Sequence, residues 1–133
     1  MTIYYKRGFK YQLAQTYVHQ LGFVIPNNIT TSFIDAAPDG LVVIREGYAW
    51  DGPSGPAIDT KNFMRGSLVH DALYQLMRDG FLDKGFREKA DLELERICLA
   101  DGMCKIRAWW VYLAVRVFAG CCITHKKEVE AAP

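Results

Sequence analysis

The segment GSLVHDALYQLMRDG, residues 66–80, decides the fold class because its apolar residues recur at the spacing of a helix. Gly80 is a typical C-terminal stop for that helix. His70 and Asp71 lie inside the apolar pattern. Burying an unpaired titratable group costs up to several kcal/mol, so the sequence predicts that each of these two side chains has its own partner. The positions that share the predicted inner face are Phe63, Gly66, His70, Leu73 and Met77.

Two further helices are predicted after this one, within a helical region that spans residues 57–123. The second begins at a cap on Asp83, ends near Gly102, and forms an antiparallel hairpin with the first about the turn 79–85. Its inner positions are Phe86, Ala90, Leu94 and Ile97. The third runs from about position 105 to 122, with Ile106, Trp110, Leu113, Val117 and Cys121 on its predicted inner face.

The first fifty residues have the composition of a small antiparallel sheet. Tyr11, Leu13, Tyr17 and Leu21 share one parity, as in a half-buried strand. The ranges 29–35 and 41–50 are rich in β-branched and aromatic residues, and turn-forming residues separate them. We therefore predict an α+β fold: a small N-terminal antiparallel β-sheet followed by three helices, as a single domain over residues 1–125 with a flexible tail at 126–133.

Composition excludes some classes of function. The formal net charge is only +1, so nucleic-acid binding is disfavoured. The four cysteines have no zinc-site or disulfide-scaffold spacing, which favours a reduced intracellular chain. No signal peptide is expected at the N-terminus, and Arg107 and Arg116 argue against a transmembrane segment in the apolar range 106–123.

Three residues of the predicted hairpin form a candidate catalytic group. The midpoint between His70 and Asp91 falls in the hairpin turn, so the two lie at similar height above it. Tyr74 is one helical turn from His70 and can donate its hydroxyl to the same carboxylate. A carboxylate that fixes the tautomer of a histidine leaves the other ring nitrogen as a general base.

Asp71 points away from His70, because neighbouring helix positions are about 100° apart. The nearest candidate partner is the loop WDGPSGP, residues 50–56, whose main-chain carbonyls are the hard oxygen ligands that calcium prefers. Asp51 offers a second carboxylate. A base, an orienting acid and a calcium ion are sufficient to hydrolyse an ester.

These residues resemble the calcium loop, His-Asp dyad and distal aspartate of the phospholipase A2 superfamily, most closely its disulfide-poor bacterial and parvovirus branches. The similarity covers roughly residues 48 to 95 and rests on Gly52, Pro53, Gly55, Pro56, Asp59, the motif His70-Asp71-x-x-Tyr74, and Ala90-Asp91. It implies that His70 is the base, that Asp91 is the acid that orients it, and that the hydroxyl of Tyr74 supports them. The calcium ligands it implies are Asp71 and main-chain oxygens of Trp50, Gly52 and Ser54.

A second similarity spans nearly the whole chain. The segment YAWDGPSGPAIDTKNFMRGSLVHDALYQLMR and the later helix RAWWVYLAVRVF are similar to a domain-of-unknown-function family of tailed phages and prophages, of the HDALY type. This resemblance implies a location in the host cytoplasm or the virion. The alternatives to a hydrolase are a non-enzymatic phage accessory or virion protein, or an inhibitor of a host protein, so the expected partners are a phospholipid or membrane surface, or a phage or host protein.

Trp109 and Trp110 have two interpretations. They can anchor the chain at a membrane interface, with neighbouring Lys105 and Arg107 meeting anionic head groups. The favoured interpretation is a buried core position with one exposed ring. His19 is interpreted as a surface or strand residue.

Overall fold

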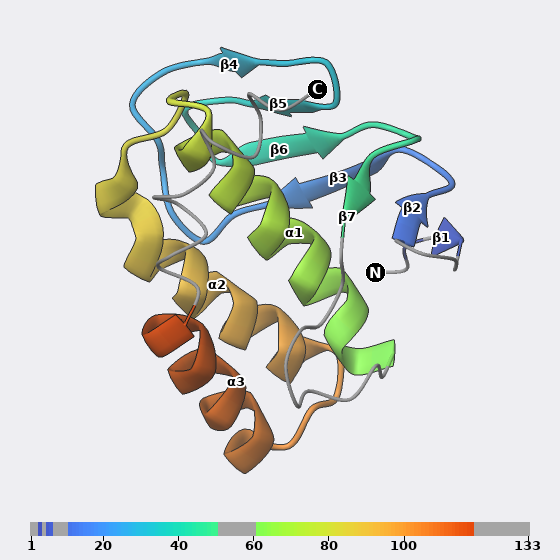
Figure 1. Ribbon diagram of the computed structural model, residues 1–133, viewed down its shortest axis with the longest axis vertical. Coiled ribbons are helices and arrows are strands. Elements are labelled where there is room, and N and C mark those ends of the chain that lie inside the picture. The colour runs from blue at the N-terminus through green and yellow to red at the C-terminus, as the bar shows by residue number, and fades with distance from the viewer. Residues whose placement is uncertain (1–2, 4, 7–10, 51–60, 119–133) are drawn as a thin grey trace.

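The computed structural model of the chain describes residues 3, 5–6, 11–50 and 61–118, and its architecture is α+β, as predicted (Figure 1). The strands are β1 Tyr5–Lys6, β2 Tyr11–Leu13, β3 Tyr17–Gln20, β4 Ile29–Thr30, β5 Ile34–Ala36, β6 Leu41–Ile44 and β7 Ala49–Trp50. The helices are α1 Lys61–Arg78, the short 3-10 helix η1 Lys84–Phe86, α2 Arg87–Ala100 and α3 Lys105–Phe118.

The strands form two antiparallel sheets rather than one. A three-stranded sheet has the order β1-β2-β7, and a four-stranded sheet has the order β3-β6-β5-β4. The predicted strands at 11–21 and 41–50 are each interrupted, at positions 14–16 and 45–48, and the two halves of each pair in different sheets. Gly47 has a φ of 94°, so the second interruption is a turn that favours glycine.

The parity predicted for the first long strand is confirmed. Leu13, Tyr17 and Leu21 are all buried, and so is His19, which has the same parity and is 4% exposed. The expectation that His19 lies on a strand is therefore correct, and the expectation of a surface position is wrong.

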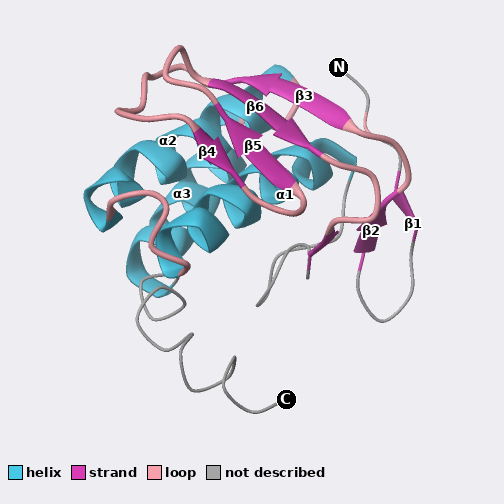
Figure 2. Ribbon diagram, turned by 90° about the horizontal axis from the view of Figure 1, so that it is seen from above, coloured by secondary structure: helices cyan, strands magenta, loops and turns pink. Residues whose placement is uncertain are grey.

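The helices lie against one face of the four-stranded sheet (Figure 2). Val42 and Ile44 of β6 and Leu68 and Ala72 of α1 belong to one buried cluster, which is the main core. A second cluster joins α1, α2 and α3; its members are Phe63, Leu94, Cys98, Met103, Ala108 and Val111. Helix α1 therefore contributes residues to both buried clusters.

The hairpin of α1 and α2 is antiparallel, as predicted, but α2 begins later than the sequence suggested. Asp83 caps η1, accepting a hydrogen bond from the main-chain nitrogen of Gly85 at 2.7 Å, and α2 starts at Arg87. Gly80, with a φ of 84°, allows the turn that follows α1.

Gly66 of α1 packs closely against α2. A Cβ atom there would lie 2.8 Å from Leu94 Cδ1 and 3.1 Å from Cys98 Sγ. Gly66→Val is expected to lower the free energy of unfolding by about 1–3 kcal/mol through overpacking, measured by urea denaturation. Ala114→Val, at an exposed position of α3, is the control. Equal stability of the two variants would show that the helix contact tolerates added volume.

The predicted inner face of α3 is wrong. Ile106, Trp110 and Val117 are 73%, 62% and 70% exposed, whereas Ala108 and Val111 are buried. Trp109 is 50% exposed, so neither tryptophan lies in the core. The buried positions lie on nearly the opposite side of the helix from the predicted ones, and both sides contain apolar side chains, so periodicity alone does not choose between them.

No helix among the described residues is long and apolar enough to cross a membrane.

Candidate functional site

The predicted triad of His70, Tyr74 and Asp91 is assembled between α1 and α2. His70 Nε2 lies 2.7 Å from Asp91 Oδ1, and the Tyr74 hydroxyl donates to the same oxygen at 2.6 Å. The rings of His70 and Tyr74 lie with their centroids 4.2 Å apart, as one helical turn requires. The carboxylate therefore contacts both side chains that the sequence assigned to it.

The second carboxylate oxygen of Asp91 has a partner that the sequence did not predict. Arg116 of α3 donates to Asp91 Oδ2 at 2.9 Å. Burial of this fully covered side chain opposes its ionisation, but hydrogen bonds from His70 and Tyr74 outweigh burial and hold the pKa of the Asp91 carboxyl below its ordinary value. Burial, followed by the bond to Asp91, raises the pKa of Tyr74, so Tyr74 remains a neutral hydrogen-bond donor at physiological pH.

The other ring nitrogen of His70 faces Asp71. Among the described residues, Nδ1 has no hydrogen-bond partner, and it lies 4.0 Å from Asp71 Oδ1. The His70 side chain as a whole is 7% exposed. With Nε2 donating to Asp91, Nδ1 carries a lone pair and can act as a base.

Asp71 lies between two contacts that hold the end of the sheet region against α1. Trp50 Nε1 donates to Ser67 Oγ at 3.0 Å, and the Tyr48 hydroxyl donates to Gln75 Oε1 at 3.2 Å. Positions 67, 71 and 75 share one face of α1, because they are four residues apart. Trp50 therefore lies beside the helix face that carries the Asp71 carboxylate, whose side chain is 34% exposed.

The remaining predicted calcium ligands, Asp51, Gly52 and Ser54, lie outside the described residues. Within the described residues, no group of three or more His, Cys, Asp or Glu side chains is arranged to hold a metal ion.

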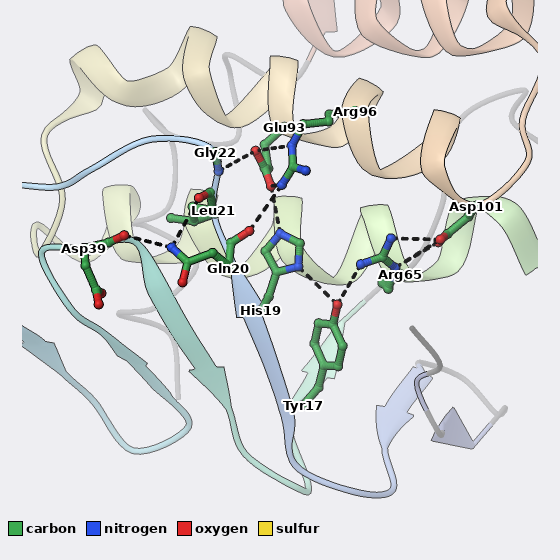
Figure 3. Close-up of polar contacts among 10 residues, drawn as sticks. All are labelled: Tyr17, His19, Gln20, Leu21, Gly22, Asp39, Arg65, Glu93, Arg96 and Asp101. Carbon is green, nitrogen blue, oxygen red and sulfur yellow. Dashed lines mark hydrogen bonds and ion pairs between the residues drawn. The ribbon is translucent and has the colours of Figure 1, made fainter.

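A second buried histidine–carboxylate pair lies between β3 and α2, and sequence reasoning missed it. His19 Nε2 lies 2.7 Å from Glu93 Oε2, and Nδ1 lies 3.1 Å from the Tyr17 hydroxyl (Figure 3). Arg65 of α1 donates to that hydroxyl at 2.9 Å and forms an ion pair with Asp101 at 2.8 Å. Both ring nitrogens of His19 are therefore occupied, so this pair joins the sheet to both helices and offers no free base.

Parity is the signal that would have revealed this pair. His19 follows Tyr17 by two residues and precedes Leu21 by two, so it shares their buried side. A buried histidine requires a partner, and Glu93 lies one helical turn from the apolar positions of α2.

The carboxyl of Glu93 makes stability depend on acid pH. Burial alone would raise its pKa, but hydrogen bonds from His19 and Arg96 lower the pKa to about 2 from the ordinary 4.5. A lowered folded-state pKa gives stability that is present above the unfolded pKa and is lost as the pH falls toward the folded one. The difference between the ordinary and the folded-state pKa of Glu93 corresponds to about 3 kcal/mol in the free energy of unfolding.

We therefore expect the wild type to lose about 3 kcal/mol more than Glu93→Gln as the pH falls from about 5 to about 2. The free energy of unfolding is measured by urea denaturation across that range. Asp91 titrates in both proteins, so its contribution cancels. Parallel curves for the two proteins would contradict the assignment.

Comparisons of the chain with protein-family models, with curated proteins and with solved structures found no match.

Proposed function

We propose that this protein is a phospholipase A2-like, calcium-dependent hydrolase of lipid or other carboxylic esters, from a phage or prophage family of the HDALY type. The observation that carries the proposal is the orientation of His70. One ring nitrogen is bound to Asp91, and the other, next to Asp71, has no hydrogen-bond partner among the described residues. This arrangement supports general-base chemistry on a water molecule held beside a cation site.

Each residue has a distinct part in the proposed reaction. His70 Nδ1 takes the proton of a water molecule as its oxygen attacks the ester carbonyl carbon, and Asp91 stabilises the imidazolium that forms. The imidazolium then returns the proton to the leaving alcohol oxygen, which gives a free carboxylic acid and an alcohol. Tyr74 holds the Asp91 carboxylate in place through its short hydrogen bond.

The donor set next to His70 suits calcium. Asp71 supplies a carboxylate oxygen, and the fixed position of Trp50 beside the same helix face supports participation of main-chain oxygens from Trp50, Gly52 and Ser54, with Asp51 as a second carboxylate. A bound calcium ion would polarise the ester carbonyl and stabilise negative charge on its oxygen.

The outward face of α3 supports a lipid substrate. Ile106, Trp109, Trp110 and Val117 are exposed along one side of the helix, and the range 105–118 contains no acidic residue. Tryptophans beside cations such as Lys105 suit an anionic phospholipid surface. The same face also favours the alternative, a non-enzymatic phage accessory or virion protein, or an inhibitor, that binds a phage or host protein.

Calcium binding gives a test that is independent of the substrate. Calcium is expected to raise the melting temperature of the wild type, because a ligand that binds only the folded state stabilises it, and to leave Asp71→Asn unchanged. At a calcium concentration about a hundred times the Kd, the stabilisation is about 2.7 kcal/mol. Glu88→Gln, at an exposed position of α2, is the control. Identical melting of wild type and Asp71→Asn with and without calcium would exclude the proposed ligand.

Hydrolysis is tested with vesicles of phosphatidylcholine or phosphatidylglycerol in calcium, with fatty acid measured by titration at constant pH. The proposal expects release by the wild type and the Glu88→Gln control, and none by Asp71→Asn. Binding to vesicles without release, or capture of a phage or host protein with no release, would favour the non-enzymatic alternative.

A further inference from the structure

Two arginines complete a closed set of contacts around the carboxylate that orients His70. Arg87 Nε donates to the Tyr74 hydroxyl at 3.2 Å, and that hydroxyl donates to Asp91 Oδ1. Arg116 Nη1 donates to Asp91 Oδ2, and the main-chain oxygen of Arg116 in turn accepts a hydrogen bond from Arg87 Nη2. We call this closed set the arginine ring; its members are Arg87, Tyr74, Asp91 and Arg116.

The ring joins all three helices at the C-terminal end of α3. Arg87 Nη2 also donates to the main-chain oxygen of Val115 at 3.1 Å. The last carbonyl groups of a helix lack partners within it, so a guanidinium that binds two of them holds the end of that helix in place. The contact of Arg87, on α2, with the end of α3 therefore holds Arg116 close to Asp91.

The donors around Asp91 explain how a buried carboxylate is stabilised in partly apolar surroundings. Asp91 is completely covered, and its two oxygens receive hydrogen bonds from three side chains: His70, Tyr74 and Arg116. Oδ1 serves both His70 and Tyr74, and Oδ2 serves Arg116. Because each oxygen has fixed donors, the carboxylate cannot rotate without breaking a charge-assisted hydrogen bond.

We propose that this ring fixes the carboxylate that orients the imidazole of His70, so that Arg87 and Arg116 are positioning residues of the site. The inference deepens the proposed function and rests on it. The consequence is that α3 must be docked for His70 to keep Nε2 toward Asp91 and Nδ1 toward Asp71. Without Arg116 on Oδ2, the carboxylate can rotate, and Oδ1 is no longer fixed opposite His70 Nε2.

The test reads the tautomer of His70 directly, by long-range proton–nitrogen NMR of the neutral ring at one pH. The wild type is expected to be almost wholly protonated at Nε2. Arg87→Gln and Arg116→Gln should each lower the ratio of the Nε2-protonated to the Nδ1-protonated form roughly tenfold, because a carboxylate that can rotate weakens the charge-assisted bond from His70 Nε2 that favours the first form. Arg116→Lys should restore part of the ratio, because an ammonium can still donate to Oδ2. Lys105→Gln, which removes a charge from the exposed start of α3, should leave the ratio unchanged.

The closed arrangement of the ring also predicts the result for the double variant. Because breaking either link opens the ring, Arg87→Gln combined with Arg116→Gln should lower the ratio no further than the more severe single variant. An unchanged ratio in either single variant, or independent effects that multiply in the double variant, would overturn the proposal. A single variant that fails to fold is replaced by Arg87→Lys or Arg116→Lys, for which the same comparison holds with smaller effects.

A hydrolysis assay distinguishes failure of this inference from failure of the proposed function. In vesicle assays, Arg116→Gln should lower kcat with little change in KM, because Arg116 acts on the base and not on the bound lipid. If the tautomer ratio shifts as expected but the wild type releases no fatty acid, the ring stands and the hydrolase proposal fails. If the wild type releases fatty acid and the ratio does not shift, the ring proposal fails alone.

Discussion

Asp91→Ala is expected to lower the free energy of unfolding by about 3–5 kcal/mol, the largest stability loss that we expect from any single carboxylate in the described fold. The cause is the set of groups left behind. His70, Tyr74 and Arg116 would lose the completely buried acceptor that they share, and unpaired buried polar groups carry the full desolvation cost.

Urea denaturation at neutral pH measures this loss. Asp91→Asn keeps the shape of the side chain and one acceptor oxygen, so its cost should be smaller. Glu88→Ala, an exposed carboxylate in the first turn of the same helix, should cost less than about 1 kcal/mol. A loss for Asp91→Ala no greater than that of Glu88→Ala would mean that the network contributes little to stability.

The second large effect is expected on turnover rather than on stability. His70→Gln should reduce fatty-acid release by roughly 10²–10⁴-fold, the usual contribution of a general base. The glutamine amide can still donate a hydrogen bond to Asp91, so the fold is preserved while the basic nitrogen is lost. The rate is measured per folded molecule on calcium-containing phosphatidylglycerol vesicles.

His19→Gln is the matched control for this variant, because His19 is the other buried histidine paired with a carboxylate of α2. Both ring nitrogens of His19 have partners within the protein, so its replacement should lower stability and leave the rate per folded molecule unchanged. Equal loss of rate in the two variants would show that the effect of His70 is structural.

The sequence was sufficient to predict the helical hairpin and the core of the site because both depend on local periodicity. His70, Tyr74 and Asp91 were placed together from their heights above one turn, and the contacts between α1 and α2 follow that register. The burial of Leu13, Tyr17 and Leu21 was likewise predictable from parity.

Features that depend on three-dimensional packing were not predictable in this way. Arg116 reaches Asp91 only because α3 packs with Ala108 and Val111 inward, and both sides of that helix are apolar enough to be the inner one. The division of the strands into two sheets depends on turns at 14–16 and 45–48, which the alternation pattern does not mark. The His19–Glu93 pair also depends on packing, because parity places His19 on the buried side but does not identify its partner on α2.

The most direct test of the central claim is the detection of both products of phospholipid hydrolysis by mass spectrometry. Wild-type protein is incubated with phosphatidylglycerol vesicles in calcium, beside His70→Gln, His19→Gln, and wild type with a calcium chelator. Fatty acid and lysophospholipid are expected in equal amounts from the wild type and from folded His19→Gln, and neither product is expected above the vesicle blank from the other two samples. Wild-type samples that contain no more of either product than the blank, or products that persist in His70→Gln, would contradict the central claim.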